Sequence, residues 1–131
     1  MRIRRSVLDD IVRHARTDAP LECCGLLIGS VELVEESHRV ANVRRSTTTF
    51  EIDPAGHFAA IRKARASNRA VVGAYHSHPV TAAVPSETDV REANDPQFVH
   101  LIVSLAGGEA DVRAYLIGNG TVEPLPLEME E

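Results

Sequence analysis

The stretch AVVGAYHSHPVTAAVPSETDV, residues 70–90, combines a strand pattern with an unusual group of polar side chains. Its first six residues are apolar or aromatic and two histidines follow, which predicts a buried strand over residues 70–78. Pro79 has no N–H to offer a neighbouring strand, so the strand ends there. The segment after Pro85 is typical of a short helix that begins at Ser86. This order of strand, loop and helix is the framework for the polar residues within it.

The two histidines lie two residues apart at the end of the predicted strand. Side chains alternate between the faces of a strand, so His76 and His78 project from the same face, with Cα atoms roughly 6.5–7 Å apart. That separation lets two imidazoles converge on one ion, and neutral imidazole is a common zinc ligand. The alternative is a surface strand that carries two solvated histidines. Their position at the carboxyl end of a buried strand favours a ligand site.

A catalytic zinc ion takes three protein ligands and keeps one position open, so a third ligand is needed. Asp89 is the nearest candidate. The same Ser-x-x-Asp pattern is also a helix start, with Ser86 as the N-cap and the Asp89 carboxylate returning to a backbone N–H. A hydroxyl can donate and accept, so Ser86 can serve both purposes. We expect the Asp89 carboxylate to serve only one of them.

Glu22 precedes the apolar run CCGLLIG, residues 23–29, which predicts a second buried strand. A carboxylate at this position is either an ordinary strand-end charge or a group placed in a polar site. If a metal ion is bound nearby, Glu22 is the best candidate for the base that takes a proton from its water.

Cys23 and Cys24 lie within the same apolar run. A cysteine nucleophile needs a base and a lowered pKa, whereas alternation buries at least one of these two side chains. A cysteine peptidase is therefore an alternative, and two buried core residues are the simpler interpretation. Neighbouring cysteines seldom pair, so no disulfide is expected and a reducing compartment is the default.

The remaining pattern predicts a mixed α/β (α+β) domain. Asp53 followed by Pro54 marks a helix start, Ser6 is a plausible N-cap, and Asn119-Gly120 is a hairpin signal. Residues 128–131 are expected to be frayed. The expected helices cover residues 6–16, 53–68 and 86–95, and the expected strands cover 23–29, 31–43, 47–52, 70–78, 98–105, 110–118 and 121–127.

The length and net charge of the chain exclude some classes of function. The chain has 131 residues, which suits one domain, and a net charge of −5, which argues against nucleic-acid binding. Arg44, Arg45 and the arginines of residues 62–65 are solvated or could contact an acidic partner. The first residues are too charged for a signal peptide, and no apolar run reaches transmembrane length. The sequence therefore predicts a soluble, cytoplasmic protein that does not bind membranes.

Taken together, the polar residues resemble a known motif. Glu22, the His76-Ser77-His78 triplet and Ser86-x-x-Asp89 are similar in kind and spacing to the JAMM, or MPN-plus, motif of zinc metallopeptidases, many of which are deubiquitinases. The order of helices and strands also agrees, over nearly the whole chain. The resemblance implies a cytidine-deaminase-like fold, in which a curved sheet is flanked by helices, and a single metallopeptidase domain over residues 1–131.

The resemblance also implies a role for each residue. Zinc would be held by His76, His78 and Asp89, with water in the fourth position. Glu22 would take a proton from that water and deliver it to the leaving amine. The Ser86 hydroxyl would donate to the oxyanion that develops in the transition state.

Within the family, the chain looks most like the small prokaryotic members that process ubiquitin-like sulfur-carrier proteins, on the segments ECCGLL, TTTFEID, YHSH and PSETDV. That implies hydrolysis of a peptide or isopeptide bond after a C-terminal Gly-Gly. Such a tail can enter a narrow groove as an added strand. The alternative is a non-catalytic MPN-type module that binds ubiquitin-like partners.

Overall fold

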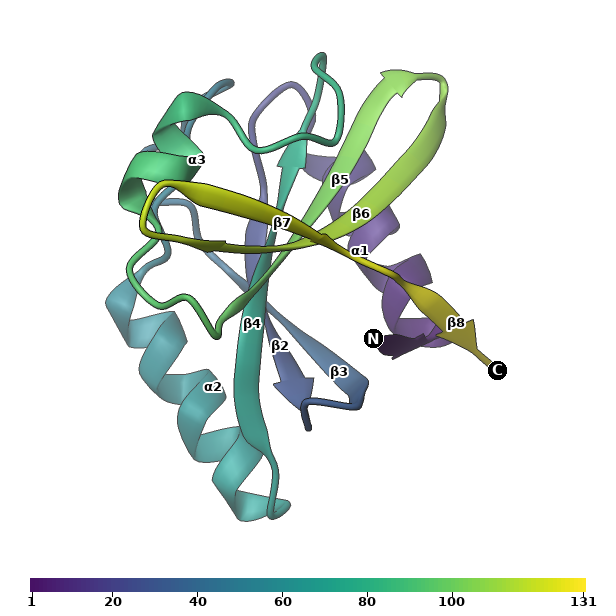
Figure 1. Ribbon diagram of the computed structural model, residues 1–131, viewed down its shortest axis with the longest axis vertical. Coiled ribbons are helices and arrows are strands. Elements are labelled where there is room, and N and C mark those ends of the chain that lie inside the picture. The colour runs from purple at the N-terminus through teal and green to yellow at the C-terminus, as the bar shows by residue number, and fades with distance from the viewer.

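The computed structural model describes residues 1–131 as one mixed sheet with three helices (Figure 1). The strand order is β7-β6-β5-β4-β2-β3-β1-β8. Strands β4 and β5 are parallel, β1 is parallel to both β3 and β8, and the other pairs are antiparallel. The bounds are β1 Arg2–Arg4, α1 Arg5–Asp18, β2 Cys24–Gly29, β3 Leu33–Val40, α2 Pro54–Ala66, β4 Ala70–His78, α3 Glu87–Glu92, β5 Val99–Gly107, β6 Glu109–Gly118, β7 Thr121–Leu125 and β8 Glu128–Glu130. The predicted fold class is confirmed.

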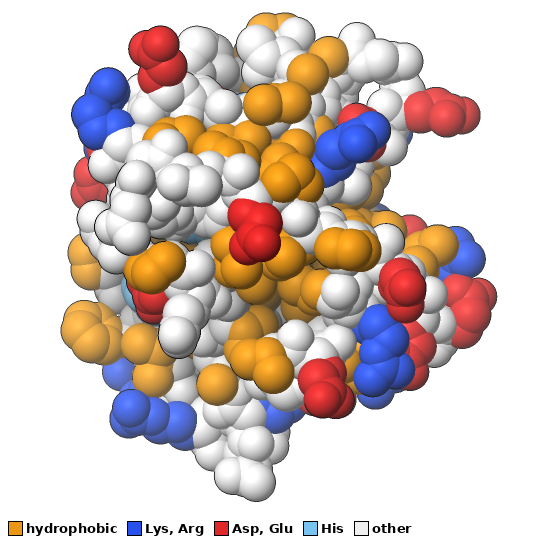
Figure 2. Space-filling view, in the orientation of Figure 1, with side chains coloured by type: hydrophobic (Ala, Val, Ile, Leu, Met, Phe, Trp, Pro, Cys, Tyr) orange, Lys and Arg blue, Asp and Glu red, His pale blue; other side chains and the backbone are white.

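The sheet is curled. Strands β7 and β8 lie at opposite edges of the strand order, yet only Pro126 and Leu127 separate them in the chain. The two edges must therefore approach each other, and Figure 1 shows β7 passing across the molecule into β8. The space-filling view shows a notch between the β5–β6 hairpin and this C-terminal segment, with hydrophobic side chains gathered across the middle of the face (Figure 2).

Alternation along β2 and β4 divides the core between the two faces of the sheet. Leu27 and Tyr75 pack with the buried residues of α1 on one face. Leu26 and Ala74 pack with the buried alanines of α2 on the other. Because His76 and His78 continue the series of Ala74, they lie on the α2 face. The sheet thus presents both imidazoles at the end of its central strand.

Several local predictions are confirmed. Strand β4 has the predicted bounds, Ala70–His78. The Asp53 side chain accepts the Ala55 N–H at the start of α2, and Pro54 occupies the first turn. Asn119 and Gly120 both adopt positive φ, 53° and 75°, in the predicted turn between β6 and β7. A turn of this kind suits the twist of a hairpin.

Residues 47–52 do not form the predicted strand. Only Asn42 and Ile52 make an isolated bridge there. The Asn42 side chain accepts the backbone N–H groups of Arg44 and Glu51, and the Ser46 hydroxyl accepts those of Thr48 and Thr49. These side chains satisfy the backbone locally, so the segment folds as a structured loop in place of a strand.

Two predictions about the chain ends are wrong. Helix α1 begins at Arg5, directly after β1, and has no side-chain cap, so Ser6 is not the N-cap. Residues Glu128–Glu130 form β8, which pairs with β1, and are therefore not frayed. Both differences arise because β1 and β8 pair with each other, a contact between opposite ends of the chain. None of the helices is long and apolar enough to cross a membrane.

Candidate metal centre

His76 and His78 close strand β4 with both rings buried and their Nε2 atoms 3.1 Å apart. Nδ1 of His78 lies 2.8 Å from the Ala82 carbonyl oxygen, so this nitrogen must carry the proton and donate it. The Nε2 lone pair of His78 is therefore free to face the cluster. The His76 ring stacks on Phe50, with ring centroids 4.2 Å apart and an angle of 19° between the planes.

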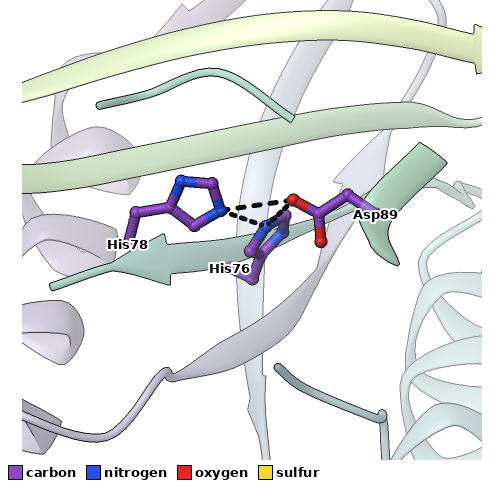
Figure 3. A group of neighbouring side chains, drawn as sticks. All are labelled: His76, His78 and Asp89. Atoms are coloured by element: carbon purple, nitrogen blue, oxygen red, sulfur yellow. Dashed lines mark hydrogen bonds and ion pairs between the residues drawn. The ribbon is translucent and has the colours of Figure 1, made fainter. Parts of the chain in front are cut away.

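Asp89 reaches both imidazoles from helix α3 (Figure 3). Its Oδ2 atom lies 3.1 Å from Nε2 of His76 and 3.2 Å from Nε2 of His78. The same oxygen accepts the Ser86 N–H at 2.9 Å, which completes a capping box. We expected this carboxylate either to cap the helix or to face the histidines. It does both, because one carboxylate oxygen can accept a backbone N–H and still point toward a second group.

The three donor atoms fit a divalent metal ion such as zinc. Their separations of 3.1, 3.1 and 3.2 Å are close to the distance of about 3.3 Å between neighbouring ligands of a tetrahedral zinc with bonds of about 2.0 Å. Burial lowers the pKa of His76, which keeps the ring neutral. Burial opposes ionisation of Asp89, but its close contacts with His76 and His78 keep the pKa of the carboxyl well below its usual range. Burial opposes protonation of His78, but the adjacent Asp89 carboxylate raises the pKa of that ring overall, so a metal ion that binds here has to displace a proton from His78.

Glu22 lies beside this cluster. Cys24 pairs with His76, and continuing the antiparallel register by two residues places Glu22 across from His78. The Glu22 backbone is held on both sides, because its N–H donates to Ser46 and its carbonyl accepts from the Asn42 side chain. The fixed position of this backbone follows from the loop over residues 41–53, which the sequence did not predict.

The Glu22 side chain is buried, and its Oε1 atom has no hydrogen-bond partner in the protein. Burial raises the pKa of Glu22 to about 7, while His78 opposes that rise and Asp89 adds to it. A buried carboxylate oxygen without a partner is costly and needs an explanation. A water molecule or a substrate group next to the donor cluster would supply the missing partner.

The two serines of the motif lie in different places. The Ser86 hydroxyl accepts the Asp89 N–H at 3.0 Å, which leaves its proton available to donate to a substrate atom. The Ser77 hydroxyl accepts the Cys23 N–H at 2.8 Å on the opposite face of β4. Ser77 therefore ties β4 to the start of β2 on the side of the strand away from the imidazoles.

A hollow of about 500 Å³ opens beside the cluster. His76 and Asp89 line it together with Phe98 and His100, from β5 and the segment before it. Burial lowers the pKa of His100, and His76 adds to that effect, so His100 adds no positive charge to the hollow near neutral pH. The hollow provides space for a bound chain next to the candidate metal ligands.

Sequence reasoning missed the residues that the loop over residues 41–53 contributes. Phe50 stacks on His76, and Asn42 fixes the Glu22 carbonyl. Arg44, which we expected to be solvated or to contact an acidic partner, is paired with Glu92 of α3. A lone aromatic residue in the polar segment TTTFEID was the only local signal of this role.

Residues 4–118 match a family model described as prokaryotic homologues of the JAB domain. A protein named CysO-cysteine peptidase from Mycobacterium tuberculosis is 33% identical over 132 residues, which cover 98% of this chain and 90% of the relative. A desampylase from Haloferax volcanii is 37% identical over 106 residues, 76% of each chain. These relatives carry the names of enzymes.

Solved structures with similar folds are consistent with this family. A protein from Desulfitobacterium hafniense, determined in solution, superposes with a TM-score of 0.92 at 31% identity, covering 99% of this chain and 92% of the other. A structure described as a JAMM metalloprotease-like zinc site superposes with a TM-score of 0.63 at 26% identity, covering 100% and 98%. The fold is thus shared with a structure whose description names a zinc site.

Proposed function

Because this chain belongs to the family of prokaryotic homologues of the JAB domain, we propose that it is a zinc-dependent peptidase or isopeptidase. Its substrate is a ubiquitin-like or sulfur-carrier protein, cut after a C-terminal Gly-Gly. Residues 1–131 form one metallopeptidase domain. The observation that carries the proposal is the buried, unpartnered Glu22 carboxylate beside three converging donor atoms.

His76, His78 and Asp89 hold the metal ion through atoms that already converge. When bound, zinc acts as a Lewis acid and lowers the pKa of water toward about 7. Glu22, with its pKa raised to about 7, can accept a proton from water and release it again near neutral pH. It therefore serves first as the base and then as the acid that protonates the leaving amine.

Ser86 stabilises the transition state. Its hydroxyl oxygen is fixed by the Asp89 N–H, so the proton of the hydroxyl is held at the first turn of α3. There it donates to the oxyanion that forms on the scissile carbonyl, an interaction that matters only in the transition state. The same short helix supplies a metal ligand and an oxyanion donor, three residues apart.

A Gly-Gly tail suits this site for a physical reason. The His76 ring is covered by Phe50, His78 is buried and the Asp89 side chain is only 7% exposed, so the candidate ligands lie below the surface of the protein. Glycines let the carbonyl approach closely, and their backbone groups can pair as an added strand. The relatives named above support a substrate of this class, because their names refer to CysO-cysteine and to desampylation.

The direct test uses candidate carriers that bear an extension beyond Gly-Gly. They are incubated with the zinc-loaded protein, and intact mass is measured with and without a chelator. We expect loss of the extension after Gly-Gly, abolished by the chelator and absent with Glu22→Gln. If a carrier is bound yet stays intact with zinc present, the protein is an MPN-type binding module and the proposed reaction is wrong.

A further inference from the structure

Helix α3 carries both Ser86, at its N-cap, and Asp89, yet the core holds it weakly. None of the residues Glu87–Glu92 is buried. Only Val90 and the following Ala93 pack, partly buried, against the small core cluster under the helix. A helix of one and a half turns is marginal by itself. Something other than the hydrophobic core must fix the place of this helix over the imidazoles.

Besides the imidazoles that contact Asp89, Arg44 makes a polar contact to α3 from outside the helix. Its two terminal nitrogens lie 3.0 and 2.6 Å from the two carboxylate oxygens of Glu92, a paired arrangement that fixes orientation as well as distance. Glu51 lies 3.5 Å from the same guanidinium. Glu92 follows Asp89 by three residues, so both side chains lie on one side of the helix.

The loop that presents Arg44 is itself braced. The Asn42 side-chain oxygen accepts the backbone N–H groups of both Arg44 and Glu51, at 3.1 and 3.0 Å. The Asn42 amide also donates to the Glu22 carbonyl at 3.1 Å. Arg44 therefore extends from a segment that is tied to the candidate base and, through Phe50, to His76.

The exposure of the pair limits its effect on global stability. The side chains of Arg44 and Glu92 are 32% and 44% exposed, and ion pairs of that kind contribute little to the free energy of unfolding. Its effect must therefore be local. Both residues line the same hollow as His76 and Asp89, so a shift of α3 would change the metal site directly.

We propose that Arg44 is a positioning residue that holds helix α3, and with it Asp89 and Ser86, in register with the imidazoles of β4 through its paired contact with Glu92. This inference rests on the proposed metal site. The loop between β3 and α2 then connects Glu22, through Asn42, with the helix that carries Asp89, through Arg44.

The test is the zinc affinity of the full chain, measured by chelator competition without substrate. Arg44→Ala should raise the zinc Kd by about 10-fold, in the range found when a contact behind a metal ligand is lost. The zinc Kd of Arg44→Lys should lie between those of the wild type and Arg44→Ala, because an ammonium group cannot pair with both carboxylate oxygens. Arg44→Glu should raise the zinc Kd more than Arg44→Ala does. Combining Arg44→Glu with Glu92→Arg should recover most of the zinc affinity.

Arg39→Ala is the matched control, because Arg39 makes a comparable exposed pair with Asp10, at 3.0 Å, away from the site. It should leave the zinc Kd unchanged, and thermal unfolding of the metal-free Arg44 variants should match that of this control. In turnover assays, Arg44→Ala should lower kcat with little change in KM.

Three results would overturn the inference: an unchanged zinc Kd for Arg44→Ala, no recovery in the exchanged double variant, or a raised KM with normal zinc affinity. The last would make Arg44 a substrate contact. These outcomes differ from failure of the proposed function, in which the unaltered protein itself takes up no zinc.

Discussion

The Oδ2 atom of Asp89 lies 3.1 Å from Nε2 of His76 while it caps the helix that carries it. One carboxylate therefore couples the start of α3 to the end of β4. The geometry of the candidate metal site and the placement of α3 depend on each other, and changes at either one should be visible at the other.

Substituting Asp89 separates these two roles. Asp89→Asn keeps an oxygen that can accept the Ser86 N–H but removes the negative charge that faces the imidazoles. We expect the zinc Kd to rise by at least about 100-fold, more than for a contact behind a ligand. The metal-free protein should also lose stability near neutral pH, because the ionised Asp89 carboxylate interacts favourably with both imidazoles. Glu87→Gln, in the same helical turn and exposed, is the control. Equal zinc affinity for Asp89→Asn and the control would remove Asp89 from the ligand set.

Glu22→Gln should separate metal binding from turnover. The amide is close in shape to the carboxylate but cannot accept a proton, so zinc uptake should be retained. Turnover should fall by roughly 10²–10⁴-fold, the usual contribution of a general base. Elemental analysis of the purified variant checks that zinc is retained, and single-turnover rates check the loss of turnover. Appreciable turnover in this variant would mean that another group takes the proton.

The pH dependence of stability should report the buried Glu22 carboxylate. Its pKa rises from 4.5 to about 7 on folding, so the folded state binds the proton more tightly than the unfolded state. Its contribution is therefore favourable to folding below pH 4.5 and is lost progressively as the pH rises to 7. Relative to the wild type, metal-free Glu22→Gln should gain stability over this range, by on the order of 3 kcal/mol.

Urea unfolding of both proteins between pH 4.5 and 8, with a chelator present, measures this difference. The other titrating groups, Asp89 and the histidines among them, are common to both proteins and largely cancel. A constant difference in stability across the range would show that Glu22 is ionised or solvated as an ordinary surface carboxylate.

Ser86 combines a cap with a proposed oxyanion donor, and two substitutions distinguish them. Ser86→Ala should cost about 1 kcal/mol of stability, while Ser86→Gly should cost only a few tenths, because glycine is tolerated at the N-cap. Both variants lack the hydroxyl, so both should lose about 10²–10³-fold in kcat. Ser86→Thr should keep most of the activity. If kcat instead follows stability across the three variants, Ser86 acts only as the cap.

Cys23 and Cys24 should be inert in the folded protein. Burial raises the pKa of Cys23 to about 11 and that of Cys24 to about 12, so almost no thiolate exists at pH 8. Iodoacetamide at pH 8 should add no mass to the native chain and should modify both residues after unfolding in urea. A chelator should abolish turnover and the alkylating reagent should not. The reverse pattern would support a cysteine peptidase.

The sequence by itself determined the features that depend on neighbouring residues. Strand β4 has its predicted bounds because apolar residues 70–75 and Pro79 define it locally. The Asp53 cap and the Asn119-Gly120 turn depend on backbone preferences within a few residues. His76 and His78 share a face because strand side chains alternate, so the imidazole pair could be predicted without the fold.

Only the tertiary structure decided how these parts meet. The register of β2 on β4 places Glu22 across from His78, and the return of α3 over the sheet lets Asp89 cap a helix and face two imidazoles at once. Residues 47–52 have the composition of a strand but form a loop, because Asn42 and Ser46 take up their backbone N–H groups. The first two outcomes depend on contacts between segments far apart in the chain, which no local pattern encodes. The third depends on side-chain hydrogen bonds that replace strand pairing. The candidate ligands could therefore be predicted from the sequence. The geometry that lets them act together comes from strand register and loop contacts.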